Sequence, residues 1–151
     1  ITHNTITMKK ERLKIIPGIY LVLFKENEVL LLRRYNTGYE DGNYSLVGGH
    51  LDDNESYENA IIREAKEEAG IDLESKDIKA LHVLHRNQDG NRIDIFFTAS
   101  KWVGEPKTME PEKCDDVSWF PIDNLPTNII PFIKQALEKS KEKTLYSDFG
   151  F

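Results

Sequence analysis

Cysteine is almost absent from this 151-residue chain: Cys114 is the only one, so an internal disulfide is excluded. A chain without disulfides suits a reducing compartment, and we expect a cytoplasmic location. No apolar run approaches the roughly 20 residues that a membrane-spanning helix needs, so no membrane partner is expected. The segment Ile1 to Lys10 is polar and lacks the apolar core of a secretory signal.

Basic residues are also in short supply. The chain has 26 Asp and Glu against 20 Lys and Arg, which gives a formal net charge of −6. A protein that holds a long nucleic acid needs basic surface to neutralise phosphates, so we expect no such partner. Apolar material is sufficient for a core, since 39% of the residues are hydrophobic and 10% are aromatic. The length fits one domain.

The negative charge is concentrated in one segment. Residues 49–71 hold seven acidic and two basic residues, a net charge of −5, and the remaining residues together carry only −1. If the excess of acidic residues has a function, that function belongs to residues 49–71.

Hydrophobic patterning and turn residues predict strands, then a helix, then strands and a second helix. Strands are predicted over residues 15–24, 29–32, 44–47, 78–86, 92–100 and 117–120. The first two are expected to form a hairpin, and Gln88-Asp89-Gly90 marks another. This order indicates an α+β fold with helices flanking a mixed sheet.

Both helices have recognisable boundaries or faces. The first is predicted over residues 55–69, with Asp53 or Asn54 as N-cap and Gly70 as the stop. The second is an amphipathic helix over residues 129–137. We expect a single domain over residues 15–151 and an N-terminal extension over residues 1–14, part of it an expression remnant, with Met8 as the natural start. The aromatic C-terminal segment, residues 146–151, either folds back on the domain or meets a second subunit.

Three carboxylates share one face of the first helix, because Glu64, Glu67 and Glu68 are spaced at i, i+3 and i+4. Like charges at this spacing repel, so the cluster does not stabilise the helix. Two interpretations follow: a solvated acidic face, or a site for a hard divalent cation. Oxygen ligands without nearby His or Cys suit Mg²⁺ or Mn²⁺ better than Zn²⁺.

The context of these glutamates favours the second interpretation. The chain has Gly49, then five residues, Glu55, seven residues, and Arg63-Glu64-Ala65-Lys66-Glu67-Glu68-Ala69-Gly70-Ile71. This pattern resembles the Nudix box of the Nudix hydrolase superfamily, with a small Ala65 where a bulkier apolar residue is common. Residues 44–49 resemble the family's entry to the box, with Val47 in place of the usual proline, and residues 119–126 resemble its late strand and turn.

The resemblance covers residues 15–140 and implies the Nudix fold, an α/β/α sandwich around a mixed sheet with the box as loop-helix-loop. It also implies cleavage of a nucleoside diphosphate linked to a group X by water attack on phosphorus, with Mg²⁺, or Mn²⁺, as cofactor. Glu67 and Glu68 are then the principal metal ligands, and Glu64 is a further ligand or the general base. Arg63 is expected to orient Glu67 through a salt bridge, and Gly49 to offer a backbone carbonyl to the metal.

Residues outside the box are candidates for substrate binding: Arg33, Arg34, Tyr44, Asn128 and Glu112. Each has a plain structural alternative. The arginines contact phosphate or lie at a solvated strand end, and Tyr44 stacks on a base or packs in the core. Asn128 contacts a base edge or caps the last helix.

Glu112 lies in the loop from which some Nudix proteins send an extra carboxylate toward the metal. Glu110 and Asp115 in the same region compete with it for that role. An exposed position without function is the alternative for each of the three.

Markers of several Nudix subfamilies are missing. Arg86 and Asn87 stand where ADP-ribose pyrophosphatases often have a proline, and no tyrosine of the diadenosine polyphosphate hydrolases follows. The sequence therefore favours a nucleoside triphosphate-type or other small nucleotide as substrate. The alternatives are a catalytically silent module that binds nucleotide or a regulator, an ADP-ribose or dinucleotide hydrolase, and, disfavoured by the acidic balance, an RNA 5′-end pyrophosphohydrolase. A homodimer is left open.

Overall fold

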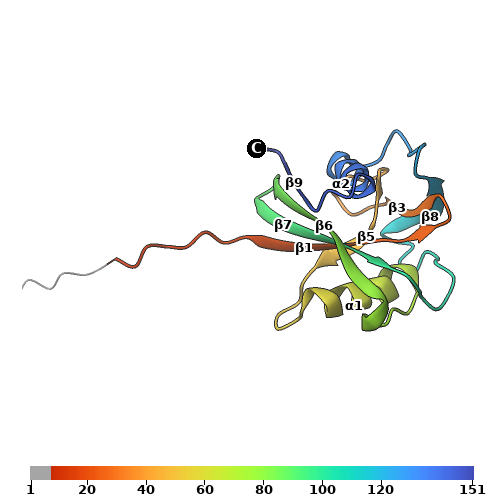
Figure 1. Ribbon diagram of the computed structural model, residues 1–151, viewed down its shortest axis with the longest axis horizontal. Coiled ribbons are helices and arrows are strands. Elements are labelled where there is room, and N and C mark those ends of the chain that lie inside the picture. Colours follow the sequence, from red (N-terminus) through yellow and green to blue (C-terminus); the bar gives the residue numbers. More distant parts are fainter. Residues whose placement is uncertain (1–7) are drawn as a thin grey trace, which may run out of the picture.

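The computed structural model describes residues 8–151. Residues 8–15 are exposed and carry no regular secondary structure, and they run away from the body of the protein (Figure 1). Residues 8–14 belong to the predicted extension, whose first seven residues lie outside the described ones. Within the described part of the chain, no helix is long and apolar enough to cross a membrane.

Five strands form a mixed sheet. In spatial order they are β5 (Val47–His50), β1 (Ile16–Val22), β7 (Asn91–Ala99), β6 (Ile78–Asn87) and β9 (Tyr146–Phe149). The β1–β7 and β6–β9 pairs are parallel, and the other two pairs are antiparallel. The β6–β7 hairpin forms at the predicted turn, where Asp89 and Gly90 have positive φ. Because β9 pairs with β6, the aromatic C-terminal segment folds back on its own sheet.

A second sheet is built around one long strand. Its members are β2 (Phe24–Lys25), β3 (Glu28–Arg34), β4 (Tyr44–Ser45) and β8 (Cys114–Pro121), and all pair with β3 in antiparallel fashion. The hairpin predicted between residues 15–24 and 29–32 is only partly correct. The two residues of β2 pair with β3, whereas β1 joins the first sheet. Strand β1 is buried on both of its faces, because Ile19 and Leu21 on one face and Val22 on the other are all buried. This is typical of a strand that is covered from both sides.

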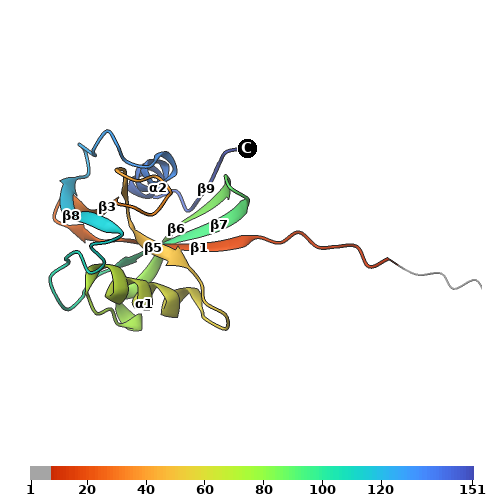
Figure 2. The same ribbon diagram turned by 180° about the vertical axis from the view of Figure 1, so that it is seen from behind.

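Two helices cover opposite faces of the strands: α1 (Tyr57–Ala69) and α2 (Pro131–Lys141). In both views, Figures 1 and 2 show α1 below the sheet and α2 above it. A 3₁₀ turn, η1 (Ser75–Asp77), precedes β6. Ile61 and Ala65 of α1 pack into one apolar cluster, and Phe132 and Ile133 of α2 pack into another. The predicted α+β sandwich is confirmed.

The first helix begins later than predicted. Ser56 is the N-cap, and its hydroxyl accepts a hydrogen bond of 3.1 Å from the backbone N–H of Asn59. Asn54, one of the two predicted caps, has φ of 60° and lies in the turn that precedes the helix. Gly70 ends the helix as predicted, in the left-handed conformation with φ of 69°.

Candidate active site

A cavity of about 270 Å³ lies between α1, β3, β5 and the loop that precedes β8. The three carboxylates that the sequence places on one helical face all line it, and the loop adds a fourth. Around them lie basic, small and apolar groups; the whole lining comprises Leu32, Arg33, Arg34, Thr37, Ser45, Leu46, Gly48, Glu64, Glu67, Glu68, Glu110, Lys113 and Cys114. The cluster is thus a feature of a cavity and not of an open solvated face.

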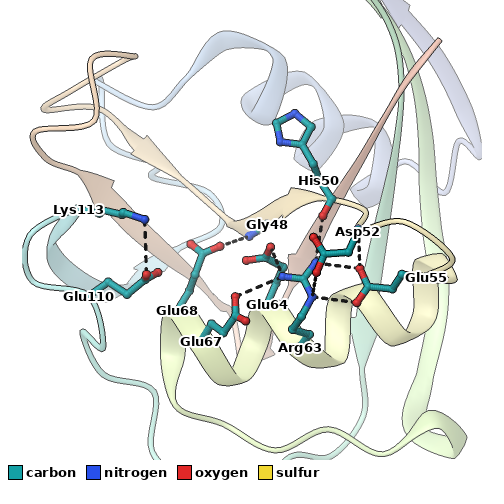
Figure 3. A network of polar contacts seen from close by, with 10 residues as sticks. All are labelled: Gly48, His50, Asp52, Glu55, Arg63, Glu64, Glu67, Glu68, Glu110 and Lys113. Carbon is teal, nitrogen blue, oxygen red and sulfur yellow. Dashed lines mark hydrogen bonds and ion pairs between the residues drawn. The ribbon is translucent and has the colours of Figure 1, made fainter. Parts of the chain in front are cut away.

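The surroundings of Glu68 in the cavity shift the pKa of its carboxyl group. One of its oxygens accepts a hydrogen bond of 3.2 Å from the backbone N–H of Gly48 (Figure 3). Burial, followed by the contact with the Glu64 carboxylate, raises the pKa of Glu68 well above its usual value. A positive charge close to Glu68 would favour the ionised form of its carboxyl group.

Arg63 ties the box together from the middle of α1. Its guanidinium donates to both oxygens of Glu55, at 2.8 and 2.9 Å, to Glu64 at 2.8 Å and to Glu67 at 3.2 Å. A further bond of 3.1 Å reaches the carbonyl of His50 at the end of β5. The expected contact with Glu67 is present, and Figure 3 shows the other contacts around the same side chain. Arg63 therefore positions carboxylates from the loop and from the helix at once.

Glu55 is part of this network and does not line the cavity. Its pKa falls to about 2, first because Arg63 holds its carboxylate and second because the backbone N–H of Asp52 donates to it at 2.9 Å. Glu55 thereby fixes the loop between β5 and α1, which sets the distance between the strand and the glutamates of the helix.

Gly48 and Gly49 allow the strand to approach the helix. A Cβ added to Gly49 would lie 2.5 Å from an oxygen of Glu64, and one added to Gly48 would lie 2.4 Å from the carbonyl oxygen of Ile19. Gly49 therefore makes room for a carboxylate, whereas Gly48 makes room for the neighbouring strand. No contact in the structure tests the predicted role of the Gly49 carbonyl.

The donors suit a divalent cation in chemical type. Carboxylate oxygens are the ligands that Mg²⁺ and Mn²⁺ prefer. A bound cation would offset the burial and the neighbouring Glu64 carboxylate, which together raise the pKa of Glu68. Across residues 8–151, however, no three His, Cys, Asp or Glu side chains are arranged to hold a metal ion. Arg63 draws Glu67 aside, and Glu67, with 53% of its side chain exposed, has room to turn toward Glu68.

Arg33 and Arg34, predicted to meet phosphate, both line the cavity. Arg33 forms an ion pair of 2.7 Å with Asp115. Arg34 donates to the carbonyl of Tyr39 at 2.7 Å and to the hydroxyl of Thr37 at 3.0 Å. Arg34 thus keeps a positive charge that no carboxylate within the described residues neutralises by an ion pair.

The other three substrate candidates do not line the cavity. Tyr44 is buried and donates from its hydroxyl to Asp116 at 2.6 Å. Asn128 donates its side-chain N–H to the carbonyl of Gly42 at 2.8 Å. It does not cap the last helix, whose N-cap is Ile130, so the capping alternative is wrong. Glu112 is exposed outside the cavity.

Glu110, which competed with Glu112 in the sequence, is the loop carboxylate that reaches the cavity. Its Oε2 lies 3.8 Å from Nζ of Lys113, and a dashed line marks this ion pair in Figure 3. The sequence could not choose between the two acids, because a loop without periodicity does not reveal which side chains face inward.

A second cavity, of about 490 Å³, adjoins the first. Arg34, Ser45, Leu46, Gly48 and Glu68 line both cavities. The second cavity adds aromatic and basic side chains from five separate segments, namely Tyr20, Tyr39, Arg86, Arg92 and Phe132. These side chains lie far apart in the sequence, so no local pattern indicates that they meet.

The comparison with known protein families agrees with this architecture. Residues 14–140 match the family model described as the NUDIX domain. Because relatives that share this family are named pyrophosphatase and diphosphatase, the chain is an enzyme of the hydrolase class. The chain belongs to the Nudix superfamily, as its sequence indicates, and hydrolases of that superfamily generally use divalent metal ions.

Individual relatives share the fold and differ in their names. The chain is 31% identical over 122 residues to an ADP-ribose pyrophosphatase of Methanocaldococcus jannaschii, covering 79% of this chain and 70% of the relative. It is 33% identical over 98 residues to an 8-oxo-dGTP diphosphatase of Proteus vulgaris, covering 65% and 85%. The crystal structure of a MutT NUDIX hydrolase from Burkholderia pseudomallei is 29% identical, with a TM-score of 0.76 over 83% of this chain and 97% of that one.

Proposed function

We propose that this protein is a Mg²⁺-dependent pyrophosphohydrolase that cleaves a small nucleotide, a nucleoside diphosphate linked to a group X. A nucleoside triphosphate-type substrate is the first choice, and ADP-ribose or a dinucleotide is the alternative. One observation carries the proposal: a carboxylate-lined cavity continues directly into a larger cavity with arginines and aromatic rings. The first part suits a metal-bound diphosphate, and the second suits an organic substituent.

The glutamates of α1 are the proposed metal ligands. Glu68 and Glu67 are the principal ones, and Glu64 is a further ligand or the general base. When bound, Mg²⁺, or Mn²⁺ in its place, neutralises phosphate oxygens and lowers the pKa of the attacking water. Arg63 positions Glu64 and Glu67 through the bonds of 2.8 and 3.2 Å described above.

Other groups in the cavity act on the substrate. Arg33 and Arg34 bind the diphosphate, because a guanidinium matches the geometry of phosphate oxygens. Glu110 replaces Glu112 as the additional carboxylate from the loop, since only Glu110 lines the cavity. Both relatives are named for cleaving a diphosphate linkage and differ in the nucleotide, so they support the reaction and leave the substrate open.

A panel of nucleotides tests this function. Nucleoside triphosphates, sugar nucleotides and dinucleotides are incubated with the protein and Mg²⁺, and the products are identified. We expect turnover of at least one substrate, with a loss of about a hundredfold or more in kcat/KM on Glu68→Gln, since even residues that only support a metal ligand contribute 10- to 100-fold. Glu74→Gln, an exposed acid outside both cavities, is the matched control.

Two results would contradict the proposal. If a folded Glu68→Gln variant kept its full activity, the assignment of Glu68 as a metal ligand would be wrong. The absence of turnover across the whole panel would favour the catalytically silent module. A cytoplasmic location stays a prediction and a homodimer stays an open possibility; the nucleotide panel tests neither.

A further inference from the structure

The second cavity adjoins the carboxylate-lined one, and this position indicates which part of a ligand it can bind. It shares Gly48 and Glu68 with the carboxylate-lined cavity, so a single ligand can occupy both. If the diphosphate lies beside Glu68, as the proposed function holds, one of its two substituents enters the second cavity. The larger volume, about 490 against 270 Å³, suits the bulkier part of the substrate.

Two of the three arginines of this cavity carry charge that no carboxylate neutralises by an ion pair in residues 8–151. Arg92 donates to the carbonyls of Gln88 and Asp89, at 3.1 and 3.0 Å, and contacts the His50 ring at 3.3 Å. None of these partners is a carboxylate. Arg34 likewise contacts only a carbonyl and a hydroxyl.

The third arginine serves a different purpose. Arg86 forms a buried ion pair of 2.7 Å with Asp94 and lies 3.8 Å above the ring of Phe132. Tyr20 meets the same ring edge-on, at 5.7 Å between ring centroids. Arg86 is therefore neutralised and holds an aromatic wall in place, so the free positive charge belongs to Arg34 and Arg92.

These two arginines can be assigned to different parts of a ligand. Arg34 lines both cavities and is placed to meet the diphosphate itself, whereas Arg92 lines only the second one. A cationic group in a cavity away from the diphosphate calls for an anion on the substituent, because a guanidinium binds phosphate with charge-assisted hydrogen bonds.

We infer that the second cavity binds a phosphate group that the substrate carries outside the scissile diphosphate, and that Arg92 selects substrates that have it. The aromatic side chains that line this cavity take the base of the nucleoside whose ribose carries the phosphate. The inference rests on the proposed function for the position of the diphosphate. It narrows the substrate class to nucleotides phosphorylated at a second site.

A matched pair of substrates tests the inference. ADP-ribose and ADP-ribose 2′-phosphate have the same diphosphate and differ by one phosphate. We expect the wild-type protein with Mg²⁺ to prefer the phosphorylated member by about tenfold to a hundredfold in kcat/KM, as one or two charge-assisted hydrogen bonds provide. Arg92→Gln should bring the ratio close to one, and Arg12→Gln, an exposed arginine in the N-terminal extension, should leave it unchanged.

A binding measurement separates this inference from the proposed function. AMP and adenosine 2′,5′-bisphosphate have no diphosphate to cleave, so calorimetry compares them without chemistry. Tighter binding of the bisphosphate that Arg92→Gln abolishes supports the inference even if no substrate is hydrolysed. Hydrolysis of both ADP-ribose probes with equal kcat/KM, or a preference that survives in Arg92→Gln, overturns the inference and leaves the proposed function standing.

Discussion

Two single residues determine where the Glu64 carboxylate lies. Arg63 donates to its Oε1 at 2.8 Å, and the missing side chain of Gly49 leaves space for the same atom. The box spacing predicted which carboxylates share a face, because three and four residues along a helix point the same way. It did not predict that Arg63 also binds both oxygens of Glu55, since that contact depends on how the preceding loop folds.

Gly49→Ala should therefore lower activity more than stability. The new methyl group would lie 2.5 Å from the Glu64 oxygen, which is pinned by Arg63 and has to shift. We expect kcat to fall by about tenfold to a hundredfold, as for small misplacements in other active sites. The melting temperature should change little, because only the end of a side chain moves.

Gly48→Ala provides the contrast for this prediction. Its Cβ would meet the carbonyl oxygen of Ile19 and the ring of Tyr20, at 2.4 and 2.5 Å, so the strands themselves have to move. Thermal unfolding should show a clear drop in melting temperature for Gly48→Ala alone. Full activity in Gly49→Ala, or equal melting temperatures in the two variants, would contradict the assignment.

At the scale of elements, the start of α1 illustrates what patterning can and cannot locate. The Gly70 stop was predicted correctly, because a glycine supplies the backbone freedom that a left-handed helix end needs. The N-cap was misplaced by two or three residues. Glu55 is bound to Arg63 and Asn54 sits at a positive φ, so the helix starts only at Ser56, for reasons outside its own sequence pattern.

Ser56→Ala tests the observed cap. The change removes the acceptor for the backbone N–H of Asn59 and should lower the free energy of unfolding by about 1 kcal/mol. Urea denaturation of the variant measures this loss. Asp53→Ala, which alters a cap predicted from sequence but not used, should leave the denaturation midpoint in place. A loss of stability in Asp53→Ala but not in Ser56→Ala would instead support Asp53 as the N-cap.

At the scale of the whole molecule, the features that sequence could not provide are those that join distant segments. The division of residues 15–25 between two sheets depends on β5 and β7, which follow far along the chain. The second cavity draws Tyr39 from a loop, Arg92 from β7 and Phe132 from α2. No local period marks such residues, whereas the glutamates proposed as metal ligands lie about one helix turn apart, so their shared face was predictable.

His82 links the C-terminal segment to the sheet in the same long-range manner. Its side chain is fully buried, with Nδ1 2.7 Å from the carbonyl of Thr144 and Nε2 2.8 Å from the hydroxyl of Ser147. Gln135 of α2 donates to the same hydroxyl at 3.1 Å. With Nδ1–H donating to the Thr144 carbonyl, Nε2 of a neutral imidazole accepts from the Ser147 hydroxyl, and this contact links β6 to β9.

The free energy of unfolding should consequently depend on pH below neutrality. Burial lowers the pKa of His82 from its ordinary value of 6.5, and the charge of Lys139 on α2 lowers it further, although the Thr144 carbonyl opposes both. Between the folded and unfolded pKa values the unfolded chain binds more protons, so stability falls as the pH drops below 6.5. Above 6.5 this contribution is fully present.

Urea denaturation at a series of pH values, for the wild type and His82→Gln, measures the effect. The variant is expected to be less stable throughout, so only the slope of unfolding free energy against pH is compared. The wild-type slope between pH 6.5 and the lowered pKa should exceed that of the variant, because His82→Gln has no group to titrate there. Parallel curves would show that the imidazole takes up its proton without disturbing β9, and that the C-terminal strand is held by its backbone pairing with β6 instead.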